Sequence, residues 1–174
     1  IRYIPKKVIP SNRGEFKNKI AIIGGGPAGL SCAYYLALTG YRPIVFEKNE
    51  KPGGMLTYGI PSYKLEKDVV EAEIDIIRAL GVEIKCGVEV GKDITLDELR
   101  KDGYEAFYIA IGCQGSRKSG VDGEDADGVM SAVDILHEIA ENHNLDLKGN
   151  KTVVIGGGNV AVDVARSTKR CGAD

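Results

Sequence analysis

The sequence predicts an α/β protein with a doubly wound parallel sheet, and three observations support this fold class. Short apolar runs rich in β-branched residues end in glycine clusters at two places, after Ile23 and after Ile155. Each glycine cluster opens a segment that reads as a helix. An acidic residue, Glu47, closes the next expected strand after the first cluster. The repeat of strand, glycine turn and helix predicts two Rossmann-like units in tandem.

The first elements follow from local signals. Residues 1–18 combine two prolines and scattered charges with no periodic apolar face, which predicts an extended linker. The apolar run at 19–23 is typical of a central parallel strand buried on both faces. A helix is expected over 27–39, because Pro27 suits a first helical position and Gly40 suits a left-handed cap.

The rest of the first unit continues with alternating elements. The apolar spacing predicts an amphipathic helix over 68–80, and Thr95 with Glu98 forms a capping box. The other expected elements are a strand at 43–46 that ends at Glu47, a loose strand at 82–90 and a buried strand at 106–111.

The second unit begins after a polar, glycine-bearing crossover at 112–128. A helix is expected over 131–142 and a strand over 152–155. The predicted domains are therefore a linker (1–18), the N-terminal part of one nucleotide-binding domain (19–120) and the beginning of another (121–174). The chain opens with Ile1 and stops soon after an expected helix, so we expect it to be part of a longer protein.

Composition excludes several classes of protein. The chain has 23 basic and 25 acidic residues, interspersed, so no sustained positive field favours nucleic acid or an anionic membrane. No apolar run reaches the roughly 18 residues of a spanning helix, and no signal sequence opens the chain. We expect a cytoplasmic protein. The four cysteines match neither a disulfide framework nor a metal site, so no metal ligand is predicted.

The first glycine cluster carries the clearest chemistry. The run Gly24-Gly25-Gly26-Pro27-Ala28-Gly29 satisfies G-x-G-x-x-G between a strand and a helix, and Glu47 follows at about the 20-residue spacing of the dinucleotide fingerprint. Gly24 permits the tight turn, Gly26 lets a pyrophosphate approach, and Gly29 brings the helix close to the strand. Glu47 can accept hydrogen bonds from ribose hydroxyls and would repel a 2′-phosphate. The first nucleotide is predicted to be FAD or NAD and not NADP.

The second cluster, residues 156–161, repeats the turn with Ala161 in the third position. The end of its following strand, where an acidic or basic side chain selects NAD or NADP, lies beyond Asp174. A second dinucleotide site is predicted, with NADPH or NADH left open. Two such sites suit a protein in which one site holds a bound redox cofactor and the other brings a hydride donor to it.

At family level, the sequence resembles the glutamate synthase small subunit-like oxidoreductases, which bind FAD and NAD(P) and also include the reductase half of dihydropyrimidine dehydrogenase. The flavin subunit of electron-bifurcating ferredoxin:NADP oxidoreductase is similar. The resemblance rests on Ile22–Leu30, Phe46–Lys48, Gly53–Leu65, Ala110–Gly112, Gly123–Asp125 and Gly156–Asp163, of which Gly53–Leu65 is the most specific.

The resemblance implies roles for individual positions. Residues 24–28 would hold the FAD diphosphate, and Glu47 would hold the adenosine ribose. Met55 and Lys64 would lie on the flavin side, while Val90 would meet the adenine through its backbone. Residues 158–160 would face the NADPH diphosphate. Motifs and resemblance together nominate as cofactor-binding residues Gly24, Gly25, Gly26, Pro27, Ala28, Gly29, Glu47, Lys48, Gly54, Met55, Lys64, Val90, Ala110, Gly112, Gly156, Gly158, Asn159 and Val160.

The expected function is flavoprotein oxidoreductase activity that passes electrons from NAD(P)H to FAD and on to an iron-sulfur domain or subunit, with a large catalytic subunit as a further partner. We expect this piece alone to be inactive. Hydride transfer needs stacking and exclusion of water, so no catalytic side chain is named. Cys113 is interpreted as a packing residue, and His137 and His143 as surface residues without chemistry.

Two alternatives remain at this point. A thioredoxin-reductase-like disulfide reductase would need a cysteine pair, and no second cysteine stands near Cys113. The other alternative is a non-catalytic module that binds nucleotide or supports assembly.

Overall fold

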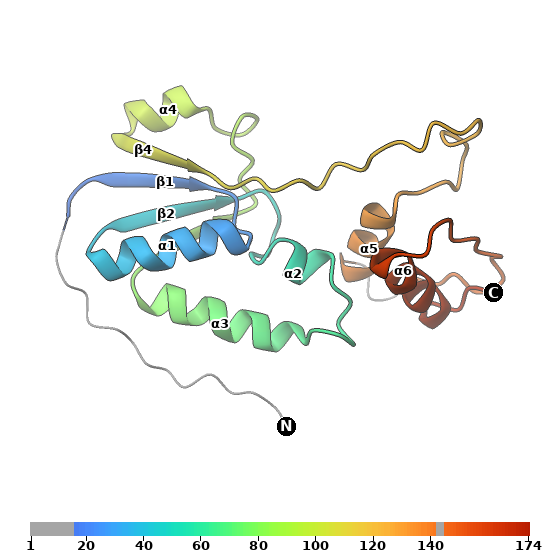
Figure 1. Ribbon diagram of the computed structural model, residues 1–174. Helices are drawn as coiled ribbons and strands as arrows, with labels where there is room; N and C mark the ends of the chain where they lie inside the picture. The colour runs from blue at the N-terminus through green and yellow to red at the C-terminus, as the bar shows by residue number, and fades with distance from the viewer. Residues whose placement is uncertain (1–15, 142–144) are drawn as a thin grey trace. The chain divides into compact units, whose positions relative to one another are not determined.

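Helices separate the successive strands between residues 19 and 109, as the first glycine turn predicts (Figure 1). The structure is a computed structural model that describes residues 16–141 and 145–174. The predicted linker therefore lies almost entirely outside the described residues, as does His143. The elements are β1 (Lys19–Ile23), α1 (Pro27–Thr39), β2 (Arg42–Glu47), α2 (Met55–Tyr58), α3 (Lys67–Ala79), β3 (Glu83–Cys86), α4 (Leu96–Lys101), β4 (Tyr104–Ile109), α5 (Ala132–Glu141) and α6 (Asn159–Arg170).

The four strands form one parallel sheet in the order β3-β2-β1-β4. Because the connection from β2 to β3 includes α3, and the connection from β1 to β2 is α1, the strands run parallel through helical crossovers. The predicted α/β fold is confirmed. All four carboxyl ends lie at one edge of the sheet, where α/β proteins bind their ligands.

Both faces of the sheet are covered, as two-residue alternation along the central strands requires. Ile22 and Val45 pack with α1, and α1 in turn contacts α3 on the same side (Figure 1). Ala21 and Phe46 pack on the other side with Leu99 of α4. Burial on both faces explains why β1 is almost continuously apolar.

Contacts divide the chain into two units. The first comprises residues 1–57 and 65–112, and the second comprises residues 58–64 and 113–174. The sequence had suggested a boundary near residue 120. In the second unit, Ile135 and Leu136 of α5 pack on Val164 of α6. No helix in the described part of the chain is long and apolar enough to cross a membrane.

Three expected strands differ from prediction. The strand expected at 106–111 is β4, which has only β1 beside it among the described strands, so Tyr108 and Ile109 are exposed rather than buried. The loose strand at 82–90 shortens to β3, because Gly87 adopts a φ of 70°. The prediction of a strand at 152–155 is wrong, because no described strand pairs with this segment. Val153 and Ile155 are 85% and 95% exposed.

Candidate functional site

The first glycine turn lies between β1 and α1, at the carboxyl edge of the sheet. Gly24 has a φ of 110°, and a Cβ there would overlap the carbonyl oxygen of Ala110. A Cβ on Gly29 would overlap the carbonyl oxygen of Gly24 and come within 3.1 Å of Ile22 Cγ2. The chain's own packing therefore requires glycine at both positions. The roles predicted for these two residues in the turn and in close helix packing are confirmed.

Gly26 is different, because nothing in the described chain requires a glycine there. Its φ of −77° and ψ of −178° suit any residue, and a Cβ would meet only Gly54 Cα, at 3.9 Å. Space for a ligand is therefore left beside Gly26. A glycine that internal packing does not explain is what a closely approaching ligand requires.

The start of α1 carries donors for such a ligand. The helix's first backbone hydrogen bond runs from Leu30 N to Gly26 O, at 2.9 Å. The amides of Ala28 and Gly29 precede it, and among described residues no side chain caps the helix at Gly26. Pro27 occupies the first helical position, where its missing amide costs nothing. Unpaired amides at a helix N-terminus form an anion site suited to a diphosphate.

Glu47 ends β2 with its carboxylate against the glycine turn. The residue is 5% exposed, and its Oε2 accepts a hydrogen bond from Gly25 N at 2.7 Å. Its Oε1 accepts another from Asn49 N at 2.9 Å. We expected the Gly25 amide to face a diphosphate, but its N–H donates a hydrogen bond to the Glu47 carboxylate instead. Each carboxylate oxygen keeps a further lone pair that a ribose hydroxyl could use.

The glycine pair after Glu47 lies against the same turn. Gly53 N donates to Gly25 O at 2.7 Å, and a Cβ on Gly54 would come within 2.9 Å of Gly26 Cα. Gly54 therefore lets the two loops pack in contact. Met55 follows at the start of α2 and is exposed.

Other nominated residues lie around this edge of the first unit. Val88 N donates to Glu47 O at 3.0 Å, which brings the segment containing Val90 beside the end of β2. Ala110 N donates to Ile23 O at 2.8 Å, so the residue after β4 lies against the turn. The remaining two, Lys48 and Gly112, are exposed. Binding by these residues stays a prediction.

The second glycine turn repeats the geometry of the first. Gly156 has a φ of 126°, as Gly24 has 110°. Gly158 caps α6 with φ −78° and ψ 175°, and Val162 N makes the first helical bond to Gly158 O at 3.1 Å. No described atom lies within 4 Å of a Cβ placed on Gly158. This turn, with exposed Asn159 and Val160 after it, offers a second helix N-terminus to a diphosphate.

Lys64, expected on the flavin side, belongs to the second unit. Its Nζ lies 2.5 Å from Asp163 Oδ1 on α6. A flavin contact by Lys64 stays a prediction, whereas the ion pair was not foreseen. Sequence reasoning also missed Asn49, whose position two residues after the end of β2 was the available signal.

Two interpretations of single residues need correction. Cys113 is exposed, so it is no packing residue. His137, interpreted as a surface residue, is only partly exposed, and its ring stacks on that of Tyr58 with centroids 4.7 Å apart.

The described cysteines are free. Burial and the negative charge of Glu47 raise the pKa of the Cys86 thiol.

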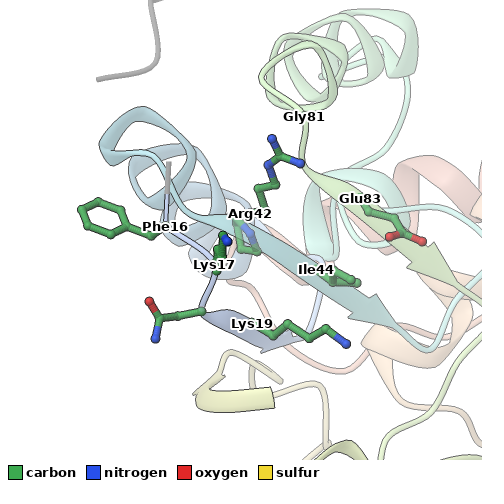
Figure 2. A pocket seen from close by; sticks show the side chains of 9 residues that line it. Phe16, Lys17, Lys19, Arg42, Ile44, Gly81 and Glu83 are labelled. Atoms are coloured by element: carbon green, nitrogen blue, oxygen red, sulfur yellow. The ribbon is translucent and has the colours of Figure 1, made fainter. Parts of the chain in front are cut away.

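A separate hollow lies at the opposite edge of the sheet (Figure 2). It is lined by the beginnings of β1, β2 and β3, with Lys17, Lys19, Arg42 and Glu83 among its side chains. Lys19 Nζ donates a hydrogen bond to Asp102 O, at 2.8 Å. The amino ends of parallel strands are not where such sheets bind nucleotides, so the glycine turns remain the candidate site.

Comparison with known proteins gives consistent matches. A family model described as pyridine nucleotide-disulphide oxidoreductase matches residues 18–174. The chain is 48% identical over 157 residues to the NADP(+)-dependent formate dehydrogenase subunit beta of Moorella thermoacetica, covering 89% of this chain and 22% of that protein. It is 40% identical over 165 residues to the glutamate synthase [NADPH] small chain of Escherichia coli strain K12, covering 89% and 35%.

A solved structure, FprA from Mycobacterium tuberculosis in complex with NADPH, matches with a TM-score of 0.72 and 29% sequence identity. The match covers 86% of this chain and 36% of that one. The chain therefore spans only about a fifth to a third of the length of these three proteins.

Proposed function

Because the chain belongs to the pyridine nucleotide-disulphide oxidoreductase family, we propose that it forms the FAD-binding part and the beginning of the NAD(P)H-binding part of a flavoprotein oxidoreductase. The division we propose is FAD at residues 19–120 and pyridine nucleotide at residues 121–174. The whole protein would pass electrons from NADPH to FAD and onward to a partner.

One observation carries the FAD assignment: Gly26 leaves room that the chain's own atoms do not use, directly before the unpaired amides of α1. The described residues fit both the diphosphate and the adenosine ribose of the cofactor. Ala28 and Gly29 would donate to the diphosphate, and Glu47, already held by Gly25, would accept from the ribose. A buried carboxylate at this place disfavours a nucleotide with a 2′-phosphate.

The second turn supports a second dinucleotide, since Gly158 and Gly26 share one backbone geometry. NADPH is the proposed donor, because the printed names of the formate dehydrogenase and glutamate synthase relatives specify NADP(+) and NADPH. FAD, when bound, would accept the two electrons of one hydride and could release them one at a time. The chain's residues would bind and orient both nucleotides, and we assign none of them a proton transfer.

The proposed acceptor is an iron-sulfur domain or subunit. The relatives are described as a subunit beta and a small chain, which supports assembly with other subunits. A dithiol acceptor within this chain is disfavoured, because its four cysteines are far apart in sequence and none forms a close pair.

The test is the visible absorption spectrum of the purified full-length protein, followed by anaerobic titration with NADPH and NADH. Flavin absorption bands that bleach on addition of NADPH at lower concentration than NADH are expected. A colourless protein that also fails to bind added FAD would overturn the assignment and favour a non-catalytic module.

A further inference from the structure

A short segment of the first half of the sequence is built into the second unit. Residues 58–64 group with residues 113–174, although the residues on both sides of them belong to the first unit. We call Tyr58–Lys64 the strap. Three of its side chains make separate contacts with α5 and α6.

Tyr58 attaches the strap to α5. It is 5% exposed, and its ring stacks on His137 with centroids 4.7 Å apart and planes 20° apart. A stacked pair of this geometry with a buried tyrosine ring is a substantial packing contact.

Tyr63 attaches the strap to α6. Its ring lies 4.0 Å from the guanidinium carbon of Arg170 and 4.7 Å from that of Arg166. These arginines are four residues apart, so they share one face of the helix. Both distances lie within the range of cation–π attraction. The tyrosine hydroxyl donates to Asp163 O only at 3.5 Å, which makes the ring the main contact.

Lys64 completes the attachment to α6. Its Nζ lies 2.5 Å from Asp163 Oδ1, and the Asp163 side chain is only 13% exposed. A carboxylate so largely buried depends on its cationic partner, since an unpaired buried charge is strongly unfavourable. Asp163, Arg166 and Arg170 form a stripe along α6 beside the stripe of its buried residues, Val164, Ser167 and Thr168.

We propose that the strap is a positioning element for α6 and therefore for the second glycine turn, and that Tyr63 sets the affinity for the pyridine nucleotide without touching it. This inference rests on the proposed function of that turn. Helix α6 begins at the second glycine turn. Loss of the contacts between the strap and α6 therefore lowers the fraction of molecules in which the backbone amides at the start of α6 are positioned to bind the diphosphate. Apparent affinity falls with that fraction.

The test compares three variants of the full-length protein. Tyr63→Leu removes the ring, Tyr63→Phe keeps it, and Tyr35→Leu is a control at an exposed tyrosine of α1 in the first unit. Hydrogen exchange of the α6 amides is measured together with KM and kcat for NADPH. The flavin spectrum checks that the first site is intact.

For Tyr63→Leu we expect exchange in α6 to quicken about tenfold, the size that two cation–π contacts correspond to. Its KM for NADPH should rise severalfold, by at most about tenfold, with kcat little changed. Tyr63→Phe and Tyr35→Leu should match the wild type.

Unchanged exchange in Tyr63→Leu, or unchanged KM despite faster exchange, overturns the proposal. Wild-type protein that neither binds nor oxidises NADPH would instead refute the proposed function. In that event the exchange data alone still decide whether the strap holds α6.

Discussion

Substituting Gly26 with alanine should separate cofactor binding from folding. The backbone at Gly26 is ordinary for alanine, and the added Cβ would lie 3.9 Å from Gly54 Cα, an ordinary van der Waals contact. We therefore expect the free energy of unfolding of the FAD-free protein to change by less than about 1 kcal/mol. If a diphosphate lies against Gly26, the methyl group displaces it from the α1 amides. The loss of one or two charged hydrogen bonds would raise the Kd for FAD about 100-fold.

Gly29→Ala is the matched comparison, because a Cβ there would overlap the Gly24 carbonyl oxygen. Its free energy of unfolding should fall by about 2–3 kcal/mol or more. Urea unfolding followed by circular dichroism measures stability, and quenching of flavin fluorescence measures the Kd. The reasoning is refuted if Gly26→Ala binds FAD within about twofold of wild type, or if it is as unstable as Gly29→Ala.

Three further predictions concern other groups. Glu47→Gln should weaken FAD binding and lower the unfolding free energy by about 2 kcal/mol, since one backbone amide loses its acceptor; unchanged urea midpoints would contradict this. Hydrogen bonds from Thr95 lower the pKa of the Glu98 carboxyl below its ordinary 4.5, so its stabilising effect is present above that value and lost as pH falls below it. The stability difference between wild type and Glu98→Gln should accordingly shrink in acid unfolding curves, and a pH-independent difference would oppose the assignment. Maleimide should label exposed Cys113 before Cys86 near neutral pH, which peptide mass spectrometry can follow; equal rates would show that Cys86 is not shielded.

Elements specified by local chemistry matched the prediction closely. Helix α1 has the predicted bounds, with Gly40 in the left-handed conformation at its end. Thr95 and Glu98 form the predicted capping box. The amphipathic helix α3 differs from its predicted range by one residue at each end. Helix ends could be predicted because their signals involve neighbouring residues in the chain.

Strand predictions were weaker, because a strand depends on partners that are distant in sequence. The run 152–155 has a strand-like composition, yet no described strand pairs with it. The exposure of β4 likewise reflects its place at one end of the sheet order.

The sequence by itself determined the α/β fold class, the two glycine turns and the acid that follows the first of them, since each is a short pattern with a local physical meaning. Only the tertiary structure decided that the Gly25 amide holds Glu47, that Gly54 packs on Gly26, and that Lys64 pairs with Asp163. These contacts join residues from 22 to about 100 positions apart. Pairing over such separations depends on how strands and helices pack, which no local pattern encodes.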